Sequence, residues 1–208
     1  MILIYAGVLS VDQLNEKKFT TAYLPITAFE YVRKGNESAA NYRPTWKSTC
    51  NPGFTHALSE EISSRIGAFM LPVQPFGARV TQNAGCGIGD NEYINVGVEP
   101  GLLYEMVLDL ARCLRGQGFR RLVLHRGHPG LTMLYPLTRH LNAVEGVKTV
   151  LVYPGALISA TNSGTQAIID DREVCGCVFS EAVRLSVEYI NKAFIFMDKN
   201  GAYAPKQA

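Results

Sequence analysis

The pattern of apolar and polar positions is most regular in the middle of the chain. Apolar residues recur three and four positions apart over 103–114, which predicts an amphipathic helix with one buried face. Gly116 and Gly118 follow and predict the end of this helix, because glycine readily adopts the left-handed conformation of a C-cap. The short apolar run Leu122–Leu124 then predicts a strand that is covered on both faces. The apolar positions of the predicted helix are Leu103, Met106, Val107, Leu110 and Leu114.

Strand-like and helix-like segments alternate through the rest of the chain. The further predicted strands are Met1–Val8, Ala22–Thr27, Phe69–Pro75, Val147–Tyr153 and Phe194–Asp198. The further predicted helices are Val11–Lys18, His56–Ile66, Tyr135–Leu141 and Ser180–Asn191. This alternation predicts an α/β fold. We expect a single three-layer domain over residues 1–208, with a mainly parallel central sheet flanked by helices.

Two long segments lack such a pattern. Arg33–Phe54 is polar and irregular, and Gly77–Gly97 is rich in glycine and asparagine, so both are predicted to be loops. Loops of about twenty residues are unusual in a compact domain unless they cover a site or form an interface. Trp46 lies in the first of them and either anchors such an interface or packs on the domain's own core.

Composition narrows the class of protein. The apolar fraction of 47% and charged fraction of 18% are those of an ordinary globular domain. A net charge of only +2 argues against a nucleic-acid partner, and the lack of a long apolar run argues against a membrane span. Five cysteines, an odd number without framework spacing, predict reduced thiols and a cytoplasmic location.

Three side chains with useful chemistry follow the predicted strand at Leu122–Leu124. They are His125, Arg126 and His128, and ligands of parallel α/β sheets bind at this end of the strands. We expect His125 and His128 to take part in proton transfer, and Arg126 to bind the substrate. The alternatives are that the histidines are hydrogen-bonded structural groups and that Arg126 pairs with a carboxylate across an interface.

Further candidates lie in the irregular segments. Arg79 could orient a substrate carboxylate, and Cys86 could bind substrate or act as a nucleophile if a histidine lies within reach. Asn162 and Ser163 are candidate substrate contacts. The alternatives are that Cys86 has only a structural role and that Asn162 and Ser163 are turn formers.

The order of these landmarks resembles that of the creatininase (creatinine amidohydrolase) family. The match runs in the right order from Asp12 to Pro154. The family's first turn, which carries a glutamate, matches Leu24–Glu30, and its second turn matches Leu71–Gly77. Its helix cap matches Gly118–Arg121, and its histidine-containing glycine turn matches Arg126–Gly130. The resemblance implies a creatininase-like fold and an amidohydrolase-like reaction.

The resemblance also implies a metal site, since family members are di-metal enzymes that use zinc or manganese. The matching ligand positions in this chain are Glu30, Val32, Asn41, His128 and Ala167, with Asn162 where a later motif has histidine. Only Glu30 and His128 keep the family's ligand type, and valine and alanine cannot bind a metal. We therefore expect no di-metal centre. The site holds either no metal or a single zinc or manganese ion on Glu30, His128 and a third ligand such as His125, Cys86 or His56.

Three functions remain open at this point. The first is a divergent enzyme that acts on an amide, lactam or carbonyl substrate, with Glu30 as general base and His128 and His125 as acid/base groups. The second is a metal-dependent amidohydrolase with replacement ligands. The third is a non-catalytic subunit that binds a metabolite or a paralogous partner. The resemblance further implies a homo-oligomer, since members of the family are often hexamers.

Overall fold

The structure is a computed structural model of the chain. It describes residues 19–27, 29–32, 43–44, 52–77, 93–128, 130–161 and 172–201. The predicted strand Met1–Val8 and helix Val11–Lys18 lie outside these residues, as does Trp46.

The centre of the fold is a four-stranded sheet in which every neighbouring pair is parallel. Its order is β4-β1-β6-β7, so β7 forms one edge and the short β4 the other. The carboxyl ends of β1 and β6 are in register, with Ile26 opposite Arg126. The strands are β1 (Thr21–Ile26), β4 (Phe69–Met70), β6 (Arg121–Arg126) and β7 (Lys148–Val152).

A second, antiparallel sheet has the order β3-β2-β5. Its strands are β2 (Phe29–Val32), β3 (Arg43–Pro44) and β5 (Tyr93–Val96). Strands β3 and β5 lie within the segments predicted to be loops, so that prediction was wrong for part of each segment, and β2 lies just before the first of them. The strands have two to four residues, which is too short for a readable period of two.

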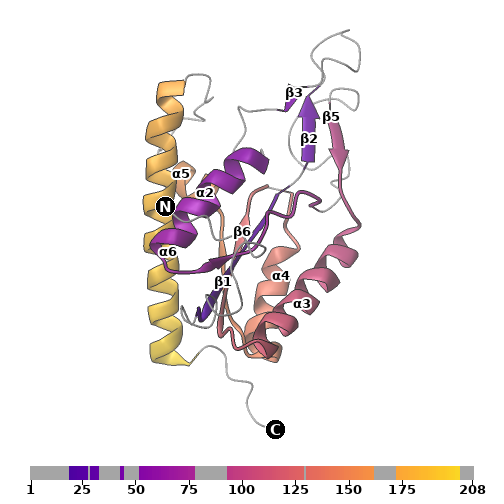
Figure 1. The fold of residues 1–208 in the computed structure, drawn as a ribbon, viewed down its shortest axis with the longest axis vertical. Coiled ribbons are helices and arrows are strands. Elements are labelled where there is room, and N and C mark those ends of the chain that lie inside the picture. The colour runs from indigo at the N-terminus through magenta and orange to yellow at the C-terminus, as the bar shows by residue number, and fades with distance from the viewer. Residues whose placement is uncertain are drawn as a thin grey trace.

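Helices cover both faces of the parallel sheet (Figure 1). On one face, α3 (Pro100–Gly116), α4 (Leu134–His140) and the π-helical turn η2 (Leu141–Glu145) pack on alternate residues of β1 and β6. On the other, α2 (Pro52–Arg65), α5 (Pro154–Thr161) and α6 (Arg172–Asn200) pack on the residues between them. The expected three-layer α/β fold with a mainly parallel sheet is therefore confirmed.

Helix α3 follows its sequence pattern closely. Leu103, Val107 and Leu114 are buried, and the predicted face positions Met106 and Leu110 pack partly buried against the same cluster. The chain leaves the helix through Gly118, which has φ = +96°, as expected for a glycine that ends a helix.

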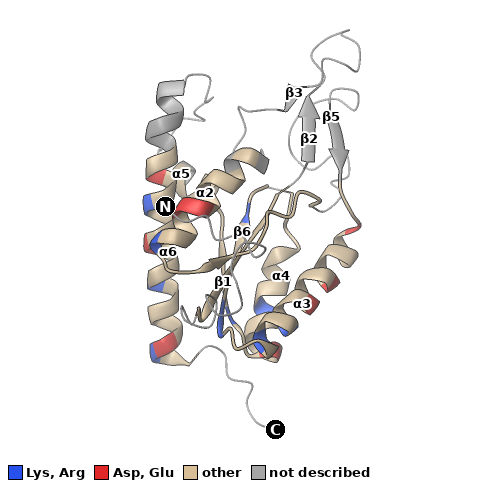
Figure 2. Cartoon of the chain, in the orientation of Figure 1, with Lys and Arg blue, Asp and Glu red and all other residues tan. Residues whose placement is uncertain are grey.

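Helix α6 is longer than predicted, since it continues through Phe194–Asp198. The prediction of a strand there was wrong because Phe194 is buried at helical spacing from Ile190, within the same core cluster. Acidic and basic residues alternate along the outer side of α6 (Figure 2), where Glu181, Arg184 and Glu188 form ion pairs one turn apart. Within the described parts of the chain, no helix is both long enough and apolar enough to cross a membrane.

Candidate functional site

Three turns meet at the carboxyl edge of the parallel sheet. Thr27 follows β1, Gly77 lies beyond β4 and Gly127 follows β6. The backbone N–H of Gly127 donates to the carbonyl of Ile26 at 2.7 Å, and that of Thr27 donates to the carbonyl of Gln74 at 3.0 Å. Turns that lie far apart in the sequence are thus joined by backbone hydrogen bonds at one edge.

This packing explains the glycines of these turns. A Cβ on Gly127 would lie 3.0 Å from the carbonyl oxygen of Ile26 and 2.8 Å from the hydroxyl oxygen of Thr55, in the first turn of α2. A Cβ on Gly77 would lie 2.5 Å from the carbonyl oxygen of Thr27. Both glycines are needed for the close approach of the backbones, rather than for an unusual φ angle.

His128 lies at this meeting point and is 1% exposed. Its Nδ1 accepts a hydrogen bond from the backbone N–H of Gly130 at 2.9 Å. A nitrogen that accepts cannot also carry the hydrogen, so the neutral ring holds its hydrogen on Nε2. His128 therefore presents an N–H donor from Nε2.

Arg126 is the last residue of β6 and its side chain extends toward α4. The guanidinium carbon lies 5.1 Å from the ring centre of Tyr135 and 4.6 Å from that of Tyr153. Nε donates to the carbonyl of His128 at 3.1 Å, and Nη1 donates to the hydroxyl of Tyr135 at 2.7 Å. These contacts place a buried positive charge beside His128, with the two tyrosine rings against it.

His125 points to the opposite face of the sheet, toward α2. Its Nδ1 lies 2.8 Å from the hydroxyl of Ser59 and 3.0 Å from that of Tyr23. Because Ser59 donates its one hydrogen to the carbonyl of Thr55, Nδ1 of His125 must be the donor in the bond to Ser59. Burial lowers the pKa of His125 to about 3 and raises the pKa of Tyr23 above its usual value.

This placement corrects our expectation for His125. It lies within β6 rather than after it, because the strand extends two residues beyond the apolar run. Successive strand residues point to opposite faces, so Arg126 and His125 cannot face one cavity. A ring that stays neutral down to about pH 3 is a poor proton carrier near neutrality.

Glu30 lies on β2, four residues after the end of β1, and its backbone pairs with Asn95 of β5. The direction of its side chain lies outside the described part of the structure. Arg79, Cys86, Asn162 and Ser163 also lie outside the described residues. Their predicted roles stay predictions.

Of the metal-ligand positions that the resemblance implies, only the side chain of His128 lies in the described part of the structure. Among the described residues, no three histidine, cysteine, aspartate or glutamate side chains come together in a way that could hold an ion. Nε2 of His128 carries a hydrogen and so has no lone pair to offer, while Nδ1 already accepts from Gly130. Metal binding by His128 would require this hydrogen bond to be lost or the Nε2 hydrogen to be displaced.

Sequence reasoning missed Tyr135 and Tyr153 as residues around Arg126. Tyr153 could have been found by register, because it follows β7 at the position that neighbours Arg126 on β6. Tyr135 lies on α4, and no local pattern shows that this helix turns a tyrosine toward the strand.

Comparisons with known proteins bear on the fold. No protein-family model and no curated protein sequence matches the chain. A zinc–zinc form of a creatininase mutant matches with a TM-score of 0.67 and 16% identity, over 93% of this chain and 99% of that one. A manganese creatininase matches with a TM-score of 0.62 and 16% identity, over the same shares of the two chains. A creatinine amidohydrolase structure matches with a TM-score of 0.61 and 16% identity, over 92% and 98%. The expected resemblance is confirmed at the level of architecture: this chain has the creatininase fold.

Proposed function

We propose that this chain is a divergent creatininase-fold hydrolase of small-molecule metabolism, which cleaves the C–N bond of a small amide or lactam. The observation that carries the proposal is the buried His128, whose tautomer presents an N–H where the three turns meet. A shared fold alone does not determine a reaction, so the proposal rests on these site residues.

In this proposal Glu30 is the general base, and the Nε2–H of His128 donates a hydrogen bond to the carbonyl oxygen of the substrate. Water adds to the carbonyl carbon of the substrate as Glu30 takes one of its protons. The C–N bond then breaks, and the departing nitrogen receives from Glu30 the proton that Glu30 took from water. Glu30 thereby returns to its carboxylate form, and His128 keeps its Nε2–H throughout.

Arg126 supplies the charge that binds the substrate in this account. Its guanidinium is always protonated, and burial strengthens its attraction for a carboxylate or a polarised carbonyl. Arg79, Cys86, Asn162 and Ser163 are proposed as further substrate contacts. His125 is a positioning residue, since its bonds to Ser59 and Tyr23 tie β6 to α2 and β1.

We derive no step through a metal ion, because the tautomer of His128 does not fit one. The prediction of no metal, or of one zinc or manganese ion, is tested by the metal content of the purified protein. If other residues supplied a full set of metal ligands, the alternative of a metal-dependent amidohydrolase would be favoured.

A non-catalytic subunit is the second candidate function. The observation that favours it is the replacement of family ligand positions by Val32 and Ala167 while the fold is kept. Such a subunit would bind a metabolite or a paralogous chain through the same edge. It would show no turnover, but it would copurify with its partner.

The experiment is a hydrolysis assay on a panel of creatinine, a hydantoin, a lactam and linear amides. His128→Asn keeps an acceptor for the Gly130 N–H but removes the Nε2–H donor, so we expect kcat/KM to fall by about 100-fold or more. Glu30→Gln should have a loss of similar size. The matched control is Glu61→Gln, which alters only an exposed ion pair with Arg65.

Two outcomes would count against the proposal. Absence of turnover on the whole panel favours the non-catalytic subunit. Turnover that survives both site variants places the chemistry elsewhere. Long-range nitrogen–proton NMR of the His128 ring separately checks the predicted Nε2–H tautomer.

The homo-oligomer and the cytoplasmic location are also proposals. The first comes from the family resemblance and is measured by light scattering on the purified protein. The second comes from the cysteine count and is measured by fractionation of cells that express the chain.

A further inference from the structure

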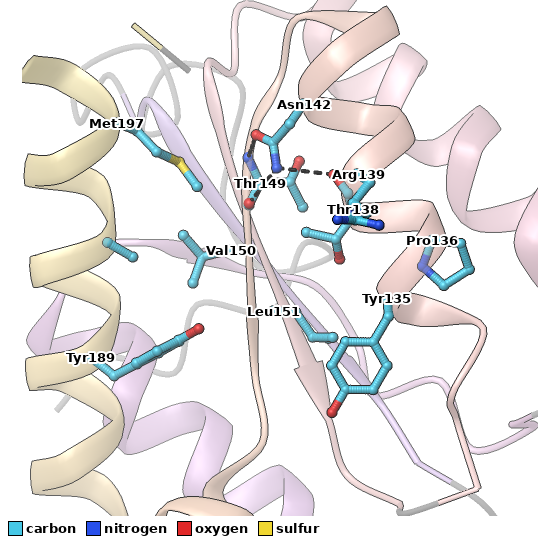
Figure 3. Close-up of a pocket in the computed structure, with 11 residues that line it drawn as sticks. Tyr135, Pro136, Thr138, Arg139, Asn142, Thr149, Val150, Leu151, Tyr189 and Met197 are labelled. Atoms are coloured by element: carbon cyan, nitrogen blue, oxygen red, sulfur yellow. Dashed lines mark hydrogen bonds between the residues drawn. The ribbon is translucent and has the colours of Figure 1, made fainter. Parts of the chain in front are cut away.

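A groove runs along β7, the strand at one edge of the parallel sheet. It lies between α4 and α6, with the outer side of β7 as its floor, and encloses about 500 Å³ (Figure 3). Volumes of this size are typical of sites for small molecules. The proposal for this groove does not rest on the proposed function, although Tyr135 belongs to both places, since its hydroxyl accepts from Arg126.

An added strand cannot run the length of this edge. The backbone N–H and C=O groups of β7 that point away from β6 belong to Thr149 and Leu151. Those of Lys148, Val150 and Val152 point toward β6 and pair with it. The side chain of Asn142 already bonds both groups of Thr149: its Oδ1 accepts from the N–H at 2.8 Å and its Nδ2 donates to the carbonyl at 2.8 Å. Asn142 thus takes the place of a pairing strand at Thr149. Of the outward-facing residues of β7, only Leu151 could then pair its backbone groups with an added strand.

Most polar groups of the groove are also occupied. The hydroxyl of Thr138 donates to the carbonyl of Leu134, and that of Thr149 donates to the carbonyl of Val147. Asn142 additionally donates to the carbonyl of Thr138. A neutral polar ligand would therefore find few side-chain partners here.

Arg139 and two tyrosines remain as recognition groups. Arg139 is the one charged side chain among the residues that line the groove, and it has no ion pair among the described residues. Tyr135 and Tyr189 are 53% and 43% exposed. They reach toward β7 from opposite walls, at the same end of the groove (Figure 3).

We propose that this groove binds a small aromatic carboxylate. The ring of the ligand would lie over Val150 and Leu151 between the two tyrosines, where stacking and burial of apolar area favour it. Its carboxylate would pair with Arg139, whose planar guanidinium matches that geometry. The charge of Arg139 is the feature that selects an anion over a neutral molecule of the same shape.

The test uses 2-naphthoate and its neutral counterpart 2-naphthamide as probes, titrated into the full chain and followed by backbone amide NMR. We expect 2-naphthoate to shift the amides of Thr149 and Leu151, and to bind at least about tenfold more tightly than 2-naphthamide. Arg139→Gln should weaken 2-naphthoate by about tenfold and leave 2-naphthamide unchanged. Arg120→Gln, another exposed arginine, is the control and should change neither.

Two results would overturn the proposal. One is equal binding of the two probes, or shifts that avoid β7. The other is a dimer in light scattering that Tyr189→Glu converts to monomer, because a second copy would then cover the groove. Tyr189→Ala separates ligand binding from dimer formation. Under the proposal this variant binds 2-naphthoate more weakly, and its molecular mass in light scattering is that of the parent protein.

Discussion

Two neighbouring residues of β6 show how one strand position changes a side chain's role. His125 and Arg126 both follow the apolar run, yet they point to opposite faces of the sheet. His125 becomes a neutral group in the core, and Arg126 becomes a buried charge at the carboxyl edge of the sheet. Histidine and arginine both suggested a chemical role at this strand end. Because successive strand side chains point to opposite faces, only Arg126 lies beside His128.

The buried His125 predicts that stability falls with pH below neutrality. The folded protein keeps the ring neutral down to about pH 3, whereas the unfolded chain takes up a proton near pH 6.5. The unfolded state therefore binds more protons between these values, and each unit of acidification lowers the free energy of unfolding, by up to about 1.4 kcal/mol from this group. Denaturant titrations between pH 7 and pH 4.5 measure this slope.

The control for that prediction is Asn191→Ala, a change at an exposed residue of α6 that carries no titratable group. It should leave the pH slope as in the parent, whereas His125→Gln should flatten it even if the variant is less stable overall. An equal slope in the parent and His125→Gln would show that other groups cause the acid sensitivity.

Gly127 predicts a steric limit on the turn beside His128. Gly127→Ala would place a Cβ 2.8–3.0 Å from atoms of Thr55, Ile26 and Thr27, so we expect a loss of about 1–3 kcal/mol in the free energy of unfolding. Gly116→Ala is the matched control, because a Cβ there meets nothing within 4 Å, and it should be neutral or slightly stabilising. Equal stability of the two variants would mean that the turns relax freely.

Among the elements, η2 has a clear task at the edge of the sheet. The π-helical turn at the end of α4 places Asn142 against β7, where its amide bonds both backbone groups of Thr149. An exposed strand edge is a template for association with other chains, and this side chain closes part of it.

Loss of Asn142 should therefore destabilise the protein and expose its edge. Asn142→Ala removes the bonds to Thr149 and Thr138, so we expect a loss of about 1–3 kcal/mol and faster aggregation on heating. Thermal unfolding monitored together with light scattering measures both effects. Asn191→Ala, an exposed asparagine on α6, should change neither, and an unchanged Asn142→Ala protein would contradict the assigned task.

For the whole molecule, the sequence predicts the parts that follow a period. The amphipathic face of α3, the glycine at its end and the parallel order of the sheet all follow from residue spacing. The strands β2, β3 and β5 were missed because they have only two to four residues, and β3 and β5 also lie in segments without a clear apolar pattern. The continuation of α6 through Phe194–Asp198 was missed because a short apolar run fits a strand or a buried helix equally well.

The candidate site was predictable only in part, for a related reason. The position of His128 at the end of a parallel strand follows from the chain order. Its tautomer depends on the backbone of Gly130, and the setting of Arg126 depends on Tyr135 from a separate helix. The contact with Gly130 spans only two residues but depends on the conformation of the turn, and the contact with Tyr135 forms only when α4 packs beside β6.

The central claim is that this creatininase-fold protein acts through Glu30 and His128 at the carboxyl edge of its sheet rather than through a di-metal centre. The most direct test is zinc and manganese content per subunit, measured by elemental mass spectrometry on protein purified without chelator or affinity tag. The account predicts well below one equivalent, because Nε2 of His128 carries a hydrogen and two family ligand positions are valine and alanine. A stoichiometric pair of ions in every subunit would contradict it and make metal-dependent hydrolysis the better account.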